Sequence, residues 1–152
     1  MVTEHGVEIL LVEDNSNDVE LTLHAFRRYN LANRIRVARD GAEALEFLFG
    51  VGGGGDPSLD SPPRVVLLDL KLPKINGLEV LQRLKSDPRT RVIPVVILTS
   101  SREERDVVES YQLGVNSYII KPIDFDQFVN AMRTLGMYWL VLNQPPAGWV
   151  SD

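Results

Sequence analysis

Short apolar runs alternate along the chain with longer amphipathic segments. Each run is about as long as a strand, and hydrophobic residues fill most of its positions, which is typical of strands buried on both faces. Such runs occur at residues 8–13, 35–38, 65–68, 95–98 and 117–120. The third run, Val-Val-Leu-Leu, is the most apolar, and it ends at Asp69.

The segments that follow these runs have apolar residues at helical spacing. They predict helices over 17–29, 40–49, 77–85, 102–113 and 124 to about 143. Asn15 or Ser16 can cap the first helix, and Gly114 ends the fourth. Strands that alternate with helices indicate a parallel sheet covered on both faces. We therefore predict one doubly wound α/β domain.

Length and composition suit a single globular domain, because the chain has 152 residues, of which 44% are hydrophobic and 24% charged. We place the domain at residues 1–143 and a tail at 144–152, with the Gly- and Pro-rich segment 50–63 as a surface connection. A net charge of −5 offers no basic field for nucleic acid, and the lack of cysteine excludes disulfides and thiolate chemistry. No apolar run reaches membrane-spanning length and residues 1–6 lack a signal-peptide core, so we expect a cytoplasmic protein.

Polar residues with candidate chemistry follow the predicted strands. Glu13 and Asp14 come after the first strand, Asp69 after the third, Thr99 after the fourth and Lys121 after the fifth. In open α/β sheets, ligands bind beyond the carboxyl ends of the strands. Three carboxylates gathered there repel one another unless a hard cation such as Mg²⁺ joins them. With an ammonium and a hydroxyl beside them, they could stabilise a phosphoryl group on a carboxylate.

Four motifs of this chain, taken together, resemble the bacterial response-regulator receiver family. The motifs are Glu13-Asp14, residues 68–73 with Asn76-Gly77, residues 98–100, and Lys121-Pro122. Their order and spacing match that family, and the resemblance covers residues 7 to about 135. It implies a flavodoxin-like receiver fold, (βα)5, with a five-stranded parallel sheet in the order 2-1-3-4-5.

The resemblance also implies roles for individual residues. Asp69 would accept a phosphoryl group from a sensor histidine kinase, and the chain would catalyse only its own phosphorylation and dephosphorylation. Mg²⁺ or Mn²⁺ would be bound by Glu13, Asp14, Asp69 and the backbone carbonyl of Lys71. Phosphate binding and switching would involve Thr99, Lys121 and Tyr118, and the bond before Pro122 would be cis.

Two features narrow the resemblance. The long Gly/Pro-rich segment and the Leu-Pro-Lys sequence at 72–74 look most like single-domain response regulators that are paired with bacterial phytochrome kinases. Glu13 departs from the family pattern, which more often has aspartate there, although a longer carboxylate can still reach the metal directly or through water.

These residues also have simpler interpretations. Taken alone, Glu13-Asp14 is an ordinary solvated strand end, Lys121 a surface lysine, and His5 and His24 solvent-facing side chains. A haloacid-dehalogenase-like phosphatase also uses a strand-end aspartate with Mg²⁺, but it needs a second acid where this chain has Lys71. A phosphorelay intermediate fits the same motifs, and a flavodoxin-like cofactor binder is disfavoured because acidic strand ends repel phosphate.

The last predicted helix suggests self-association. Its residues Phe125, Phe128, Val129, Met132, Leu135, Trp139 and Leu142 can face the sheet, yet residues 137–142 are apolar on every side. Such a helix is normally buried all round. We therefore predict a homodimer through the fourth helix, fifth strand and fifth helix. Its interface would contain Val107, Tyr111, Met137, Tyr138, Leu140 and Val141. The alternative is that the tail folds back and Trp149 covers the patch.

Overall fold

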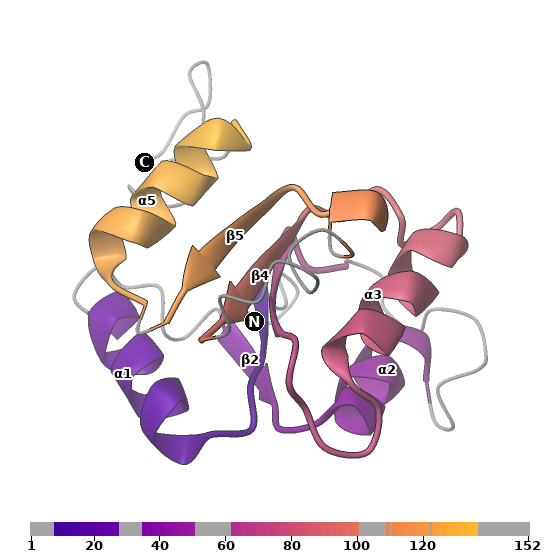
Figure 1. The fold of residues 1–152 in the computed structure, drawn as a ribbon, viewed down its shortest axis with the longest axis horizontal. Coiled ribbons are helices and arrows are strands. Elements are labelled where there is room, and N and C mark those ends of the chain that lie inside the picture. Colours follow the sequence, from indigo (N-terminus) through magenta and orange to yellow (C-terminus); the bar gives the residue numbers. More distant parts are fainter. Residues whose placement is uncertain are drawn as a thin grey trace, which may run out of the picture.

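The computed structural model describes residues 8–27, 35–50, 62–100, 109, 111–121 and 123–136. Within them, β1 (Ile9–Val12), β2 (Ile35–Ala38), β3 (Val65–Asp69), β4 (Val95–Thr99) and β5 (Ser117–Ile120) form one parallel sheet (Figure 1). The strand order is β2-β1-β3-β4-β5, as predicted. All five strands lie where the apolar runs placed them, because each run is long enough to cross the sheet once and apolar enough to be buried.

The register of the sheet decides which residues meet at its carboxyl edge. Val12 pairs with Leu68, and Asp69 pairs with Leu98. In the pairing of β4 with β5, Thr99 lies opposite Ile120. The residues that follow β1, β3 and β5 therefore leave the sheet at the same edge.

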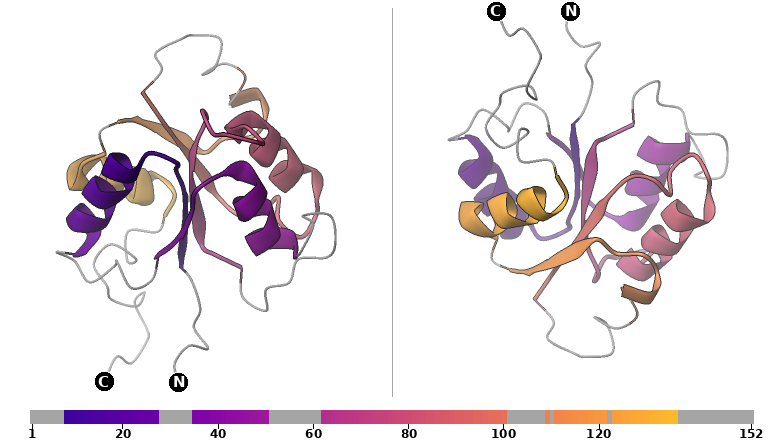
Figure 2. Two further views of the ribbon diagram at one scale, coloured as in Figure 1. Left: turned by 90° about the horizontal axis from the view of Figure 1, so that it is seen from below. Right: turned by 90° about the horizontal axis from the view of Figure 1, so that it is seen from above.

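Helices cover both faces of the sheet. The described helices are α1 (Ser16–Arg27), α2 (Gly41–Phe49), α3 (Gly77–Ser86) and α5 (Phe125–Thr134). Figure 2 shows α1 and α5 on one face and α2 and α3 on the other. Side chains alternate along each strand, so that Leu10 and Val66 pack under α2 and α3, while Ile9 and Leu11 pack under α1 and α5. None of the helices in the described part of the chain is long and apolar enough to cross a membrane.

Each described helix begins at a residue whose side chain accepts a backbone N–H of the first turn. For α1 this residue is Asn15, which accepts from the amide of Asp18 at 2.9 Å. Asp40 caps α2. Asn76 and Asp124 cap α3 and α5 through reciprocal capping boxes with Glu79 and Gln127. The sequence prediction that Asn15 or Ser16 caps the first helix is confirmed for Asn15.

The last helix is shorter than predicted. It ends at Thr134, with Leu135 as its C-cap, and Gly136 has a φ of 76°, in the left-handed region. The prediction of one continuous helix to about residue 143 was therefore wrong, because Gly136 ends it as glycine commonly does one residue after a helix. Gly114, with a φ of 89°, follows the helical residues 111–112 as predicted. Residues 28–29, 102–108, 110 and 137–143 of the predicted helices, and the tail 144–152, lie outside the described part of the chain.

Candidate functional site

Three carboxylates meet where β1 and β3 end. Glu13 follows β1 directly and Asp69 is the last residue of β3, so the pairing of Val12 with Leu68 brings the two side by side. Glu13 is 1% exposed and Asp69 is 4% exposed, whereas Asp14 lies on the surface. One oxygen from each of the three carboxylates lies within 4.8 Å of the others. The predicted acidic cluster is therefore present in the structure.

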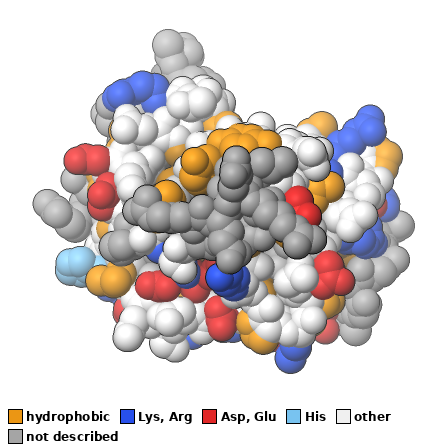
Figure 3. Space-filling view, viewed as in Figure 1, with side chains coloured by type: hydrophobic (Ala, Val, Ile, Leu, Met, Phe, Trp, Pro, Cys, Tyr) orange, Lys and Arg blue, Asp and Glu red, His pale blue; other side chains and the backbone are white. Residues whose placement is uncertain are grey.

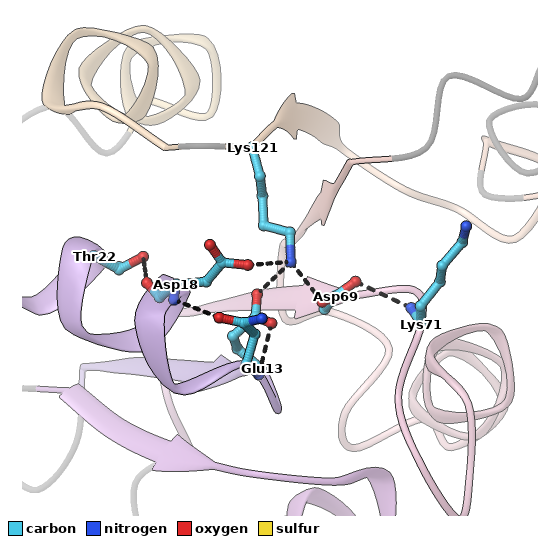
Figure 4. A network of polar contacts seen from close by, with 7 residues as sticks. Glu13, Asp18, Thr22, Asp69, Lys71 and Lys121 are labelled. Carbon is cyan, nitrogen blue, oxygen red and sulfur yellow. Dashed lines mark hydrogen bonds and ion pairs between the residues drawn. The ribbon is translucent and has the colours of Figure 1, made fainter.

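Lys121 extends from the end of β5 into this cluster. Its Nζ donates to Glu13 Oε1, Asp69 Oδ2 and Asp18 Oδ2, each at 2.9 Å. Figure 4 shows the ammonium held between the three carboxylates, with Asp18 on the side of α1. In the space-filling view (Figure 3), a basic side chain near the middle of the visible face has acidic side chains on either side of it. An ammonium has three N–H donors, so these three acceptors use all of them.

Asp18 is the member of this network that the sequence analysis missed. It lies in the first turn of α1, where an acidic residue is common simply because it complements the helix dipole. Its position in the sequence therefore gives no signal that separates a role in the site from ordinary helix stabilisation. Only the packing of α1 beside the end of β5 brings its carboxylate to Lys121.

Burial raises the pKa of Glu13 to about 7, against an ordinary value of 4.5. The hydrogen bond from Lys121 opposes that shift, while the neighbouring Asp69 adds to it. For Lys121, burial works against the charged form, but the hydrogen bonds to Asp69, Glu13 and Asp18 outweigh it and raise the pKa of the ammonium above its usual range. The site thus holds more negative charge than its one lysine neutralises.

Backbone contacts fix the position of Asp69. The amide of Lys71 donates to Asp69 Oδ1 at 3.0 Å, and the side chain of Lys71 points away from the carboxylates (Figure 4). Gly77 starts α3 so close to β3 that a Cβ there would lie 2.2 Å from the Asp69 carbonyl oxygen. Its amide donates to the Leu70 carbonyl at 2.9 Å. A glycine at 77 is therefore what lets α3 start directly against the strand that carries Asp69.

The donors at this edge fit a hard divalent cation. Oxygen ligands from several carboxylates are what Mg²⁺ and Mn²⁺ prefer. The three clustered acids indicate that a cation would be stabilised there. A groove of about 470 Å³ opens beside the cluster, lined by Asp14 and Lys71 among others. The chemistry of the donor set therefore agrees with a metal at this position.

The structure describes only part of the remaining predicted site residues. Thr99 is the last residue of β4, and its side chain, like all of Pro122, lies outside what the structure describes. Tyr118 is 38% exposed on β5, an edge strand of the sheet. It contacts Tyr111 edge to face, with ring centroids 5.7 Å apart.

The other predicted interface residues, Val107, Met137, Tyr138, Leu140 and Val141, fall outside the described residues. His24 is exposed, as predicted, and His5 is not described.

A family model and individual relatives both match most of this chain. The family described as the response regulator receiver domain matches residues 9–133. The probable methanogenesis regulatory protein FilR2 of Methanothrix harundinacea (strain 6Ac) is 45% identical over 138 residues, which cover 91% of this chain and 86% of that protein. The response regulator Rcp1 of Synechocystis sp. (strain ATCC 27184 / PCC 6803 / Kazusa) is 36% identical over 139 residues, covering 91% of this chain and 92% of that protein.

Solved structures agree with the sequence comparison. The bacteriophytochrome response regulator AtBRR is 56% identical, with a TM-score of 0.71 over 86% of this chain and 93% of that chain. The Mn²⁺-bound form of Rcp1 is 33% identical, with a TM-score of 0.68 over 95% of this chain and 98% of that chain. These proteins share both the fold and most of their length with the present chain.

Proposed function

The chain belongs to the response regulator receiver family, and from that premise we propose that Asp69 is the residue that accepts the phosphoryl group. One observation carries the assignment. Asp69 joins the acidic cluster, accepts a hydrogen bond from Lys121 at 2.9 Å and has its other oxygen fixed by the amide of Lys71. Glu13 has matching contacts, with Lys121 at 2.9 Å and with the amide of Asn15 at 3.1 Å, so the resemblance of residues 68–73 to the receiver motif is what favours Asp69. A nucleophile must be held in place and paired with positive charge, and Asp69 meets both requirements.

The transfer itself needs little from the protein beyond position and charge. A carboxylate oxygen of Asp69 forms a bond to phosphorus while the nitrogen–phosphorus bond of a kinase phosphohistidine breaks, and the bonding electron pair remains on the imidazole nitrogen. Lys121 supplies a fixed positive charge for the phosphoryl oxygens. Burial of Asp69 keeps bulk water from its carboxylate.

A divalent cation completes the proposed site. Glu13, Asp14, Asp69 and the backbone carbonyl of Lys71 would hold Mg²⁺ or Mn²⁺, and a solved structure of the relative Rcp1 is of its Mn²⁺-bound form. When bound, the cation would neutralise the carboxylates and the charge of the incoming phosphoryl group.

The proposed output is a change of interaction surface rather than turnover of a substrate. Thr99 and Lys121 would contact the phosphoryl group, and Tyr118, exposed beside Tyr111, would respond to them. The partner would be a sensor histidine kinase. A phytochrome kinase is favoured because relatives over most of the chain are phytochrome response regulators. The lysine at 71, in place of a second acid, disfavours a dehalogenase-like phosphatase.

Phosphorylation by acetyl phosphate tests the acceptor. We expect the wild-type protein to gain one phosphoryl group by intact-mass spectrometry in the presence of Mg²⁺, and Asp69→Asn to gain none while circular dichroism shows the same fold. Asp126→Asn, an exposed change on α5, serves as the control and should behave as wild type. Equal phosphorylation of Asp69→Asn and wild type would refute the assignment, and an unchanged rate in EDTA would refute the metal.

A further inference from the structure

The three carboxylates that hold Lys121 are not equivalent. Glu13 and Asp69 belong to the cluster that could bind a metal, whereas Asp18 does not. All three lie 2.9 Å from the ammonium nitrogen. Because every N–H of Lys121 already has an acceptor, a phosphoryl group on Asp69 can receive a hydrogen bond from Lys121 only when one of these contacts is given up.

Asp18 is held in place by its own helix. Its backbone amide donates to Asn15 Oδ1 at 2.9 Å, and its carbonyl accepts from Thr22 Oγ1 at 2.8 Å. Its side chain is 27% exposed, compared with 2% for Glu13 and 5% for Asp69. Water can therefore solvate the Asp18 carboxylate when Lys121 leaves it, which makes Asp18 the least costly partner to release.

We propose that Asp18 is a positioning residue that holds the Lys121 ammonium on the α1 side of the site and competes with the phosphoryl group for it. The inference rests on the proposed function, because it concerns the same transfer to Asp69. In the reaction with acetyl phosphate, an oxygen of Asp69 bonds to phosphorus, the bond from phosphorus to the acetate oxygen breaks, and acetate leaves with the electron pair. Lys121 must turn from Asp18 toward the phosphoryl oxygens during that step, so the Asp18 contact slows it.

The sign of the effect separates this role from a structural one. Asp18→Asn keeps the size of the side chain and replaces the salt bridge with Lys121 by a weaker hydrogen bond from the ammonium to a neutral amide oxygen. We expect acetyl phosphate to phosphorylate Asp18→Asn about 3 to 10 times faster than wild type in Mg²⁺. A residue that only stabilises the fold would lower the rate or leave it unchanged when it is replaced. Glu20→Gln removes the same charge from an exposed position of α1 and should not change the rate.

Salt distinguishes release of Lys121 from simple repulsion of the phosphodonor. Repulsion between Asp18 and the donor anion is screened at high ionic strength, whereas a direct contact between Asp18 and Lys121 is screened much less. The rate advantage of Asp18→Asn should therefore persist at about 0.5 M salt, where the Debye length is only a few ångströms.

A second measurement reads the contact without any phosphorylation. In metal-free protein labelled with ¹⁵N-lysine, Asp18→Asn should shift the Nζ resonance of Lys121 and speed exchange of its ammonium protons, whereas Glu20→Gln should do neither. If wild type is phosphorylated but Asp18→Asn gains no rate, loses its gain in high salt or leaves the Lys121 resonance unmoved, the role of Asp18 is refuted and the acceptor assignment stands. If wild type is not phosphorylated at all, the proposed function itself fails.

Discussion

At the scale of single residues, Lys121 neutralises part of the negative charge of the site. Its side chain is 11% exposed and contacts three carboxylates, two of them buried. Removing one partner of a buried ion pair is costly, because the remaining charge loses its compensation without regaining water. Lys121 and a bound cation would therefore both neutralise the same carboxylates. The stability lost when Lys121 is removed should depend on whether the cation is bound.

We predict that Lys121→Met lowers the free energy of unfolding by roughly 3–5 kcal/mol in EDTA at pH 8. Saturating Mg²⁺ should restore more stability to this variant than it adds to wild type, because the freed carboxylates bind the cation more tightly. Urea unfolding with and without Mg²⁺ measures both quantities.

Lys85→Met is the matched control. That lysine is half-buried and donates to the carbonyls of Arg91 and Ile93, both at 3.0 Å, so its loss should cost stability that Mg²⁺ does not restore. A Lys121→Met variant as stable as wild type in EDTA would contradict the prediction.

At the scale of elements, the turn that follows α3 depends on one carboxylate. Asp87 is the C-cap of α3 and is buried. It accepts hydrogen bonds from the backbone amide of Arg89 at 2.8 Å and from its guanidinium at 2.9 and 3.1 Å. These bonds, the side-chain bond first, lower the pKa of Asp87 to about 2 from an ordinary 3.8. The turn leads into β4, so Asp87 helps to set where that central strand begins.

We predict that Asp87 stabilises the protein at neutral pH and loses that effect in acid. A carboxyl group whose pKa is lower in the folded state stabilises the fold above its unfolded pKa, and the stabilisation disappears as pH falls from about 4 to about 2. Asp87→Asn should therefore be less stable than wild type at pH 7, and the difference should shrink toward pH 2. Urea unfolding across this range tests it. A difference that stays constant between pH 7 and pH 2.5 would show that the charge is not responsible.

At the scale of the whole molecule, the sheet leaves β5 at an edge. Tyr118 on that strand and Tyr111 are 38% and 49% exposed, and they contact each other. Tyr118 also lines a pocket of about 380 Å³ between β5 and α5. We retain the proposal of a homodimer through this face, and these two tyrosines are its support within the described residues. The apolar helix that the sequence predicted beyond Thr134 does not continue α5, which ends at that residue.

Sedimentation equilibrium at high micromolar concentration should show a dimer of the wild-type protein. Tyr111→Glu should weaken it at least tenfold, because a charge placed in an apolar contact must be desolvated when the dimer forms. Leu21→Glu on α1 replaces an equally exposed apolar side chain, 52% exposed, on a different element and should leave the dimer intact. A strict monomer with and without phosphorylation would refute the proposal.

Much of the fold and the site was determined by the sequence alone. Five apolar runs fixed the strands, and the alternation with helices fixed a parallel sheet covered on both faces. In such a sheet the carboxyl ends of all strands share one edge, so the positions of Glu13 and Asp69 at the ends of the neighbouring strands β1 and β3 were enough to bring them together, and Lys121 follows β5 at the same edge. Gly136 also marked the end of the last helix in the sequence. The helical spacing of apolar residues on both sides of it nevertheless favoured a longer helix.

Only the tertiary structure decided how Lys121 is held. Asp18 and Lys121 are 103 positions apart, and their contact depends on how α1 packs on the face of the sheet that it shares with α5. No local pattern encodes that packing, because an acid in the first turn of a helix serves the helix equally well when it faces water. The burial that raises the pKa of Glu13 is likewise a property of the packed molecule, since it comes from elements that meet only when the sheet is formed.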